Sequence, residues 1–165
     1  MNNWYIRKYN WFCQHPKAAK AVIFTCKFLS YIIYFSYIFS VLFLFIQKKW
    51  NTLIPFLLVP ATGFILETVI RAKINAPRPY EVLKIPPLDK KDTKGQSFPS
   101  RHAFSAAILS IAFYTLHPML GCILILFTII IGLCRILMGV HWTKDVCVGL
   151  LFGWFYGLIG FFFFH

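Results

Sequence analysis

Long uncharged stretches alternate with short basic segments along this chain of 165 residues. Residues 28–46, 50–66 and 146–164 each run for 17 to 19 positions without Asp, Glu, Lys or Arg. A helix of about 20 residues is long enough to cross a bilayer core of about 30 Å. Each stretch therefore predicts one membrane-spanning helix, of which the first can begin near Lys20 and the second can continue to Arg71.

The uncharged stretch 103–134 is too long for a single crossing. His117 and Pro118 lie near its middle, and a proline inside a helical pattern disfavours a continuous helix. We therefore predict two spans here, residues 100–116 and 119–137, joined by a tight turn. The whole pattern predicts an all-α, polytopic membrane bundle of about five transmembrane helices, formed by residues 1–165 as a single domain.

Composition agrees with a membrane protein, since 59% of the residues are hydrophobic and only 13% are charged. A soluble domain has about 45–50% apolar and about 25% charged residues, so an ordinary soluble globule is excluded. Residues 1–20 mix Trp and Tyr with Arg and Lys, which is typical of a helix lying in the lipid headgroup zone. We expect an interfacial segment there, and the alternative is a disordered basic tail.

The formal net charge of +12 indicates an anionic partner. In a membrane protein this partner is an anionic lipid surface or a phosphate-bearing substrate rather than a nucleic acid. Two polar segments, residues 71–101 and 135–145, connect the predicted spans. With five spans, both segments lie on the same side of the membrane as the N-terminus, so they can build one site.

The residue types in these segments suit phosphoryl transfer without a metal. Ser100 can cap the helix that follows it, and the free N–H groups of that first turn bind anions. His141 and Asp145 are one helical turn apart, so the carboxylate can hold one ring nitrogen and leave the other as nucleophile or base. Arginine side chains bind phosphate oxygens in a bidentate fork. The alternative for each residue taken alone is a structural or interfacial role.

Three short motifs carry these residues in a fixed order. They read Arg71, six residues, Arg78-Pro79; then Pro99-Ser100-Arg101-His102; then Cys134-Arg135, five residues, His141, three residues, Asp145. In order and internal spacing they resemble the signatures of the type 2 phosphatidic acid phosphatase (PAP2) family, membrane lipid phosphatases related to vanadium haloperoxidases. The resemblance covers the chain from about Arg71 to the C-terminus.

The resemblance implies a role for each matching residue. His141 would be the nucleophile that forms a phosphohistidine, Asp145 would orient it, and His102 would protonate the leaving oxygen. The phosphate oxygens would be held by Arg71, Arg78, Ser100 and Arg135. No metal and no cofactor are implied for these phosphatases.

The chain departs from the family pattern at three positions. Arg71 replaces a lysine, and Lys73, two residues further on, could share its task. Arg101 replaces a glycine, and we expect its guanidinium to contact the phosphate or the lipid headgroup. Cys134 replaces a serine, which removes a hydroxyl donor but leaves the neighbouring Arg135.

The expected function is hydrolysis of a lipid phosphate monoester or diphosphate. A polyprenyl diphosphate such as undecaprenyl diphosphate, phosphatidic acid and phosphatidylglycerol phosphate all fit. Two alternatives remain open: a lipid phosphotransferase with the same site, and a non-catalytic module that binds anionic lipids. The Lys and Arg bias would make the site cytoplasmic, whereas bacterial relatives usually have it outside. Because several of these charges are explained by substrate binding, we expect an extracytoplasmic site in a bacterial cell membrane.

Overall fold

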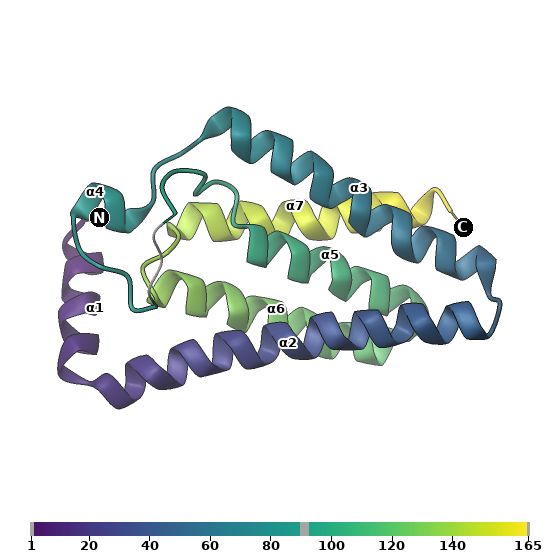
Figure 1. Cartoon of the computed structure of the whole chain (residues 1–165), viewed down its shortest axis with the longest axis horizontal. Helices are drawn as coiled ribbons and strands as arrows, with labels where there is room; N and C mark the ends of the chain where they lie inside the picture. Colours follow the sequence, from purple (N-terminus) through teal and green to yellow (C-terminus); the bar gives the residue numbers. More distant parts are fainter. Residues whose placement is uncertain (1, 90–92, 165) are drawn as a thin grey trace.

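The computed structural model describes residues 2–89 and 93–164, and every regular element in these ranges is an α-helix (Figure 1). This confirms the prediction of an all-α bundle. The helices, in chain order, are α1 (Asn2–Gln14), α2 (Pro16–Ile46), α3 (Trp50–Ile74), α4 (Pro79–Leu83), α5 (Arg101–Leu116), α6 (Pro118–Leu137) and α7 (Thr143–Phe162).

Four helical segments in the described part of the chain are long and apolar enough to cross a membrane. They are α2, the segment Trp50–Leu83 that includes α3, then α6 and α7. The remaining predicted span, α5, is shorter, with 16 residues, and only His117 separates its end from the start of α6, so the two helices run side by side along the bundle (Figure 1). Helix α5 is buried along most of its length and packs against α6 and α7, so it is an inner helix enclosed by the longer ones.

Small residues on α7 allow this close packing around α5. A side chain at Gly153 would place its Cβ 2.6 Å from the carbonyl oxygen of Phe104 on α5. A side chain at Gly149 would come within 2.8 Å of the carbonyl oxygen of Ser100. Because glycine lets two helix backbones approach, α7 holds the start of α5 directly against its own first turns.

The predicted turn between the two central spans is confirmed. α5 ends at Leu116 and α6 begins at Pro118, so His117 alone separates the two helices. Proline is favoured at the first position of a helix because it has no N–H to leave unsatisfied. The backbone N–H of Leu120 donates to Nδ1 of His117, which closes the start of α6.

The N-terminal segment is divided differently from the expectation. Residues 16–20 belong to α2, which begins at Pro16, so the separate N-terminal helix ends at Gln14. Figure 1 shows α1 turned away from α2 and lying across the end of the bundle, beside α4 and the connecting loops. This end of the bundle carries the polar segments.

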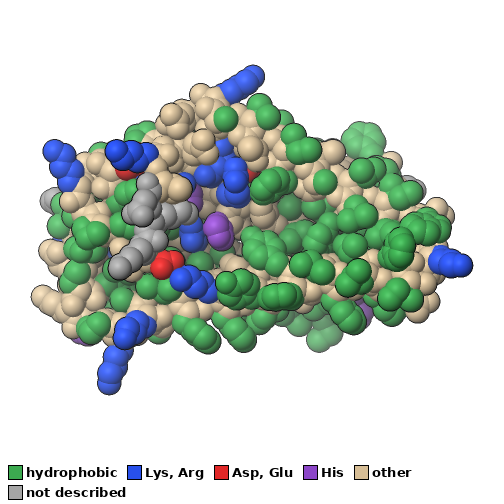
Figure 2. All heavy atoms as spheres, in the orientation of Figure 1, with side chains coloured by type: hydrophobic (Ala, Val, Ile, Leu, Met, Phe, Trp, Pro, Cys, Tyr) green, Lys and Arg blue, Asp and Glu red, His purple; other side chains and the backbone are tan. Residues whose placement is uncertain are grey.

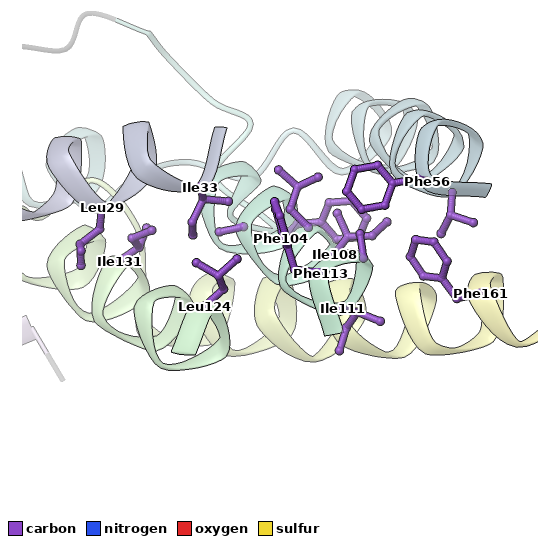
Figure 3. Close-up of a cluster of buried hydrophobic side chains, with 14 of the residues drawn as sticks. Leu29, Ile33, Phe56, Phe104, Ile108, Ile111, Phe113, Leu124, Ile131 and Phe161 are labelled. Carbon is purple, nitrogen blue, oxygen red and sulfur yellow. The ribbon is translucent and has the colours of Figure 1, made fainter. Parts of the chain in front are cut away.

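The core of the bundle is built from aromatic and branched side chains of several helices (Figure 3). Phe56, Phe104 and Phe113 are almost fully buried where α3 meets α5, and Ile33 and Leu124 are buried between α2 and α6. The outward faces are also apolar, as expected for helices surrounded by lipid, and Figure 2 shows hydrophobic side chains spread over them. Because these helices share one core, their ends at the polar end of the bundle are held in fixed positions.

Candidate active site

A cluster of buried polar side chains lies where α3 ends, α5 begins, α6 ends and α7 begins. Figure 2 shows Lys, Arg and His side chains inside a hollow near this end of the molecule. Charged groups at such depth are costly unless they are paired or functional. The buried members are Glu67, Arg71, Arg78, Ser97, Ser100, Arg135, His141 and Asp145.

His141 lies in the short connection between α6 and α7, with only 1% of its surface exposed. Its Nδ1 is 2.9 Å from the backbone carbonyl oxygen of Ser97. A carbonyl oxygen only accepts hydrogen bonds, so Nδ1 carries the proton and Nε2 keeps its lone pair. The imidazole is therefore held in the tautomer that a nucleophilic Nε2 requires.

Asp145 supports this arrangement mainly through Ser97. Its Oδ2 accepts hydrogen bonds from the hydroxyl of Ser97 and from the backbone N–H of Trp142, the latter at 3.1 Å. The distance from Oδ2 to Nδ1 of His141 is 3.8 Å, longer than a hydrogen bond. The structure thus brings Asp145 and His141 together as the spacing predicts, with Ser97 hydrogen-bonded to the carboxylate and, through its carbonyl, to the ring.

Ser97 is a site residue that the sequence analysis missed. It lies in the long loop between α4 and α5, two residues before the second motif. A serine among several polar neighbours does not indicate a site residue. Only the folded loop brings its hydroxyl and its carbonyl group against the third motif.

The surroundings of His141 favour its neutral form. Burial lowers the pKa of this imidazole below its ordinary value, and the nearby guanidinium groups of Arg135 and Arg78 lower it further. The carboxylate of Asp145 opposes this shift without reversing it. The neutral ring is the form that can attack phosphorus.

Ser100 does not cap α5 with its side chain, so that prediction is wrong. The helix is anchored instead by the backbone N–H of Ser100, which donates to the carbonyl oxygen of Asp145 at 2.9 Å. The hydroxyl of Ser100 is buried and has no hydrogen-bond partner among the described residues. It therefore stays available to a ligand at the start of α5.

Arg135, in the last turn of α6, is buried and has no hydrogen-bond partner for Nε or Nη2 within the described ranges. An unpaired buried donor of this kind costs free energy that a bound anion would recover. The side chain lines a cavity of about 360 Å³ together with His102 and Lys27. Arg135 and Ser100 thus supply unpaired donors to the site, as does Nε of Arg71.

Arg78 is committed to the backbone in this structure. All three nitrogens donate to backbone carbonyl oxygens: Nε to that of Gly95 at 2.9 Å, Nη1 to that of Val140 at 3.2 Å and Nη2 to that of Gln96 at 3.4 Å. These bonds tie the long loop to the residue that precedes His141. Arg78 therefore braces the site through three carbonyl groups, and its expected contact with a phosphate stays a prediction.

Arg71 and Lys73 have different positions although both lie in the last turn of α3. Arg71 is buried, its Nη1 donates to the carbonyl oxygen of Pro99, and its Nε is 3.4 Å from Oε1 of Glu67. Lys73 is exposed, because two residues along a helix turn the side chain by about 200°. The structure therefore brings Arg71 into the cluster and leaves Lys73 outside it.

Arg101 is turned toward α3. Its Nε is 3.3 Å from Oε2 of Glu67, its Nη2 donates to the hydroxyl of Thr68, and its guanidinium lies over the ring of Phe64. Arg101 is therefore paired with α3 in this structure, and its contact with a phosphate stays a prediction. Glu67 is the second residue that the sequence analysis missed, although an acid within an apolar helix one turn before Arg71 is a usable signal.

His102 lies between two spaces of different character. On one side it lines the cavity that contains Arg135, and on the other it lines a groove of about 520 Å³. The groove is bounded by α2, α3 and α5, and its lining is mostly apolar, as shown by Tyr37, Leu57 and Ile108. A molecule with an anionic end and an apolar tail matches both spaces.

The described residues of the site do not form a recognisable set of metal ligands. Within residues 2–89 and 93–164, no three His, Cys, Asp or Glu side chains are grouped closely enough to hold a metal ion. The positive charge of the site comes from its arginines.

Comparisons with known proteins agree with this geometry. The model of the PAP2 superfamily matches residues 52–165, and a comparison with curated protein sequences returned no match. The chain is similar in structure to LpxE of Aquifex aeolicus, with a TM-score of 0.71 and 28% identity, covering 89% of this chain and 87% of that one. It also shares the fold of a transmembrane PAP2-type phosphatidylglycerolphosphate phosphatase from Bacillus subtilis, with a TM-score of 0.70 and 24% identity, covering 90% and 77% of the two chains.

The matched range includes all three motifs, from Arg71 to Asp145. The same range contains the helices that gather His102, Arg135 and His141 at one end of the bundle. Motifs, helix arrangement and structural neighbours lead to one conclusion: this chain belongs to the PAP2 superfamily of membrane phosphatases.

Proposed function

We propose that the protein is a membrane lipid phosphatase that removes a phosphate from a lipid phosphate monoester or diphosphate through a phosphohistidine. The observation that carries this proposal is the hydrogen bond between Nδ1 of His141 and the Ser97 carbonyl, which leaves Nε2 as the basic nitrogen. The unpaired donors of Arg135 and Ser100 support binding of phosphate oxygens at the same site.

The reaction follows in two steps. Nε2 of His141 attacks phosphorus, the N–P bond forms, and the P–O bond to the lipid breaks while His102 gives a proton to the leaving oxygen. A water molecule then attacks the phosphohistidine, His102 takes a proton from that water, and the N–P bond breaks to release inorganic phosphate. Arg135, Arg71 and the first-turn N–H groups of α5 neutralise the charge of the transferred phosphoryl group.

The apolar groove supports a lipid as the substrate. Its volume of about 520 Å³ and its lining by α2, α3 and α5 suit a hydrocarbon chain that enters from the membrane. His102 borders both this groove and the cavity of Arg135, so a lipid with its tail in the groove has its phosphate near both side chains. A polyprenyl diphosphate, phosphatidic acid and phosphatidylglycerol phosphate all have this form.

The cellular setting is part of the proposal. We propose an integral protein of a bacterial cell membrane, with the site on the extracytoplasmic face. The basic residues that argue for the opposite orientation include Arg71, Arg78 and Arg135, which are buried in the site and explained by its chemistry.

The direct test measures inorganic phosphate released by the purified protein in detergent micelles. Dioleoyl phosphatidic acid and farnesyl diphosphate are compared in the same assay, with His141→Ala as the control. We expect release from at least one lipid, and no release by the control. Absence of release from both would contradict the proposal, and transfer of the phosphoryl group to a second lipid instead of water would favour a phosphotransferase.

A further inference from the structure

Helix α1 presents two different faces. Tyr5 and Phe12 are buried, with 3% and 5% of their surfaces exposed, whereas Trp4 and Trp11 are about half exposed. The buried face therefore packs on the protein, and the exposed aromatic face is suited to the lipid headgroup zone. Because α1 lies across the end of the bundle (Figure 1), the packed face meets the connection that carries His141.

Tyr5 contacts three consecutive residues of that connection. The backbone N–H of Thr143 donates to the hydroxyl of Tyr5 at 3.0 Å, and this hydroxyl is 3.5 Å from the carbonyl oxygen of His141. The ring of Tyr5 also meets the ring of Trp142 edge to face, with centroids 5.1 Å apart. The backbone that directly follows the nucleophile's Cα is thus linked to one side chain of α1.

Lys8 makes a second contact in the last turn of α6, just before the same connection. Its Nζ donates to the carbonyl oxygen of Ile136 and lies 4.4 Å from the centroid of the Tyr5 ring. Burial lowers the pKa of Lys8 to about 8, as expected for an ammonium group enclosed between α1 and α6. The unfilled space at this interface is only about 10 Å³, no more than one water molecule needs.

The connection between α6 and α7 has little regular structure of its own. Residues 138–142 lie outside the helices, and Gly139 has a positive φ of 72°. A nucleophile on such a segment depends on its neighbours for the sub-ångström placement that an in-line attack requires. Ser97 supplies one contact to the His141 ring, Arg78 holds the carbonyl oxygen of Val140 before it, and α1 supplies the contacts to the backbone after it.

We propose that Tyr5 is a positioning residue for the phosphatase reaction and that α1, by docking on residues 136–143, holds His141 in place for attack. This inference rests on the proposed role of His141 as the nucleophile. Tyr5 lines neither the apolar groove nor the cavity of Arg135, so its contribution is to the chemical step and not to substrate binding.

The test compares Tyr5→Phe with Tyr9→Phe. Tyr5→Phe keeps the ring against Trp142 and removes the hydroxyl that accepts from Thr143. Tyr9 is one turn along the same helix and half-buried, and its hydroxyl takes part in none of the hydrogen bonds described here between α1 and residues 136–143. A lost hydrogen bond of this type corresponds to a change of about 2- to 12-fold, so kcat of Tyr5→Phe should fall within that range while KM stays within about twofold. Tyr9→Phe should retain wild-type kcat.

A second substrate separates positioning from membrane attachment. We expect kcat of Tyr5→Phe to fall by the same factor on a lipid phosphate and on a short-chain, water-soluble phosphate ester, with the protein still folded in detergent. Lys8→Gln breaks the other contact and should give the same pattern, so it serves as the test if Tyr5→Phe does not fold.

Two results would overturn the inference. One is wild-type kcat in Tyr5→Phe with a correctly folded protein, and the other is a loss confined to long-chain lipid in vesicles. Either result leaves the proposed function intact as long as His141→Ala is inactive. Activity in His141→Ala would instead remove the proposed function itself.

Discussion

Replacing Arg101 separates two possible roles for this residue, which stands where the family pattern has glycine. If its guanidinium bound the phosphate, its loss would remove a charge-assisted contact worth about 1.5–3 kcal/mol, or about 10- to 150-fold in kcat/KM. In the structure Nε and Nη2 are used by Glu67 and Thr68 on α3. The geometry therefore predicts that Arg101→Ala changes kcat/KM by less than about threefold.

The same contacts predict a loss of stability. The ion pair joins a fully buried carboxylate to a guanidinium whose side chain is 37% exposed. Its contribution should lie between that of an exposed pair, about 0.2–1 kcal/mol, and that of a buried hydrogen bond to a charged group, about 1.5–3 kcal/mol. We expect Arg101→Ala to lower the free energy of unfolding by about 1–2 kcal/mol. Arg101→Gly should lower it by about 0.5–1 kcal/mol more, because glycine is a poorer helix former than alanine in the first turn of α5.

The assay measures kcat/KM on a lipid phosphate and the thermal midpoint in the same detergent. Glu67→Gln is the matched control, since it leaves both Arg71 and Arg101 without a carboxylate and should destabilise the protein more than Arg101→Ala. A tenfold or greater fall in kcat/KM for Arg101→Ala, with an unchanged thermal midpoint, would refute this reasoning and put the guanidinium on the substrate.

Three further predictions concern the reacting groups. The acid limb of the kcat/KM profile should lie below pH 6.5, because burial and two arginines lower the pKa of His141 and the neutral nucleophile is lost only as pH falls through that lowered value; a limb at or above 6.5 speaks against it. Phosphate release should persist in excess EDTA, since arginines neutralise the phosphoryl charge, and loss of release that Mg²⁺ restores would count against this site. Ser97→Ala removes the hydroxyl that donates to Asp145 and should lower kcat/KM by up to about 10- to 150-fold, while wild-type turnover would show that the hydroxyl is dispensable.

Features set by local chain chemistry could be predicted from the sequence. The apolar stretches correctly indicated α2, α3, α6 and α7, and His117-Pro118 correctly marked the break before α6. The proximity of His141 and Asp145 agreed with their four-residue spacing, although His141 lies before α7 and its Nδ1 donates to the Ser97 carbonyl rather than to the carboxylate. Such features depend on residues that are near one another in the chain, so pattern and spacing suffice.

Features set by contacts between distant segments could not be predicted. Ser97 meets Asp145 across 48 positions, and Tyr5 meets Thr143 across 138. Neither residue type differs from its polar or aromatic neighbours in the sequence. Glu67 is an intermediate case, because its place one turn before Arg71 was visible but its second partner, Arg101, depends on how α3 packs against α5.

The place of α5 inside the bundle also depended on tertiary structure. The predicted span of residues 100–116 agrees with α5, but the apolar pattern does not show that α5 is the helix buried between α6 and α7. Hydropathy therefore predicted the helix and not its place inside the bundle.

The central claim is that His141 carries the phosphoryl group during turnover. The most direct measurement traps the enzyme during the reaction with a lipid labelled in its terminal phosphate, under alkaline denaturing conditions in which a phosphohistidine survives. The label is then located by peptide mapping. The account predicts label on the peptide that contains His141 in the wild-type protein and none in His141→Ala. Label on another residue would contradict this account. So would a His141→Ala protein that retains more than about a tenth of the activity, because loss of a single acid–base group already lowers the rate by about 10²–10⁴-fold.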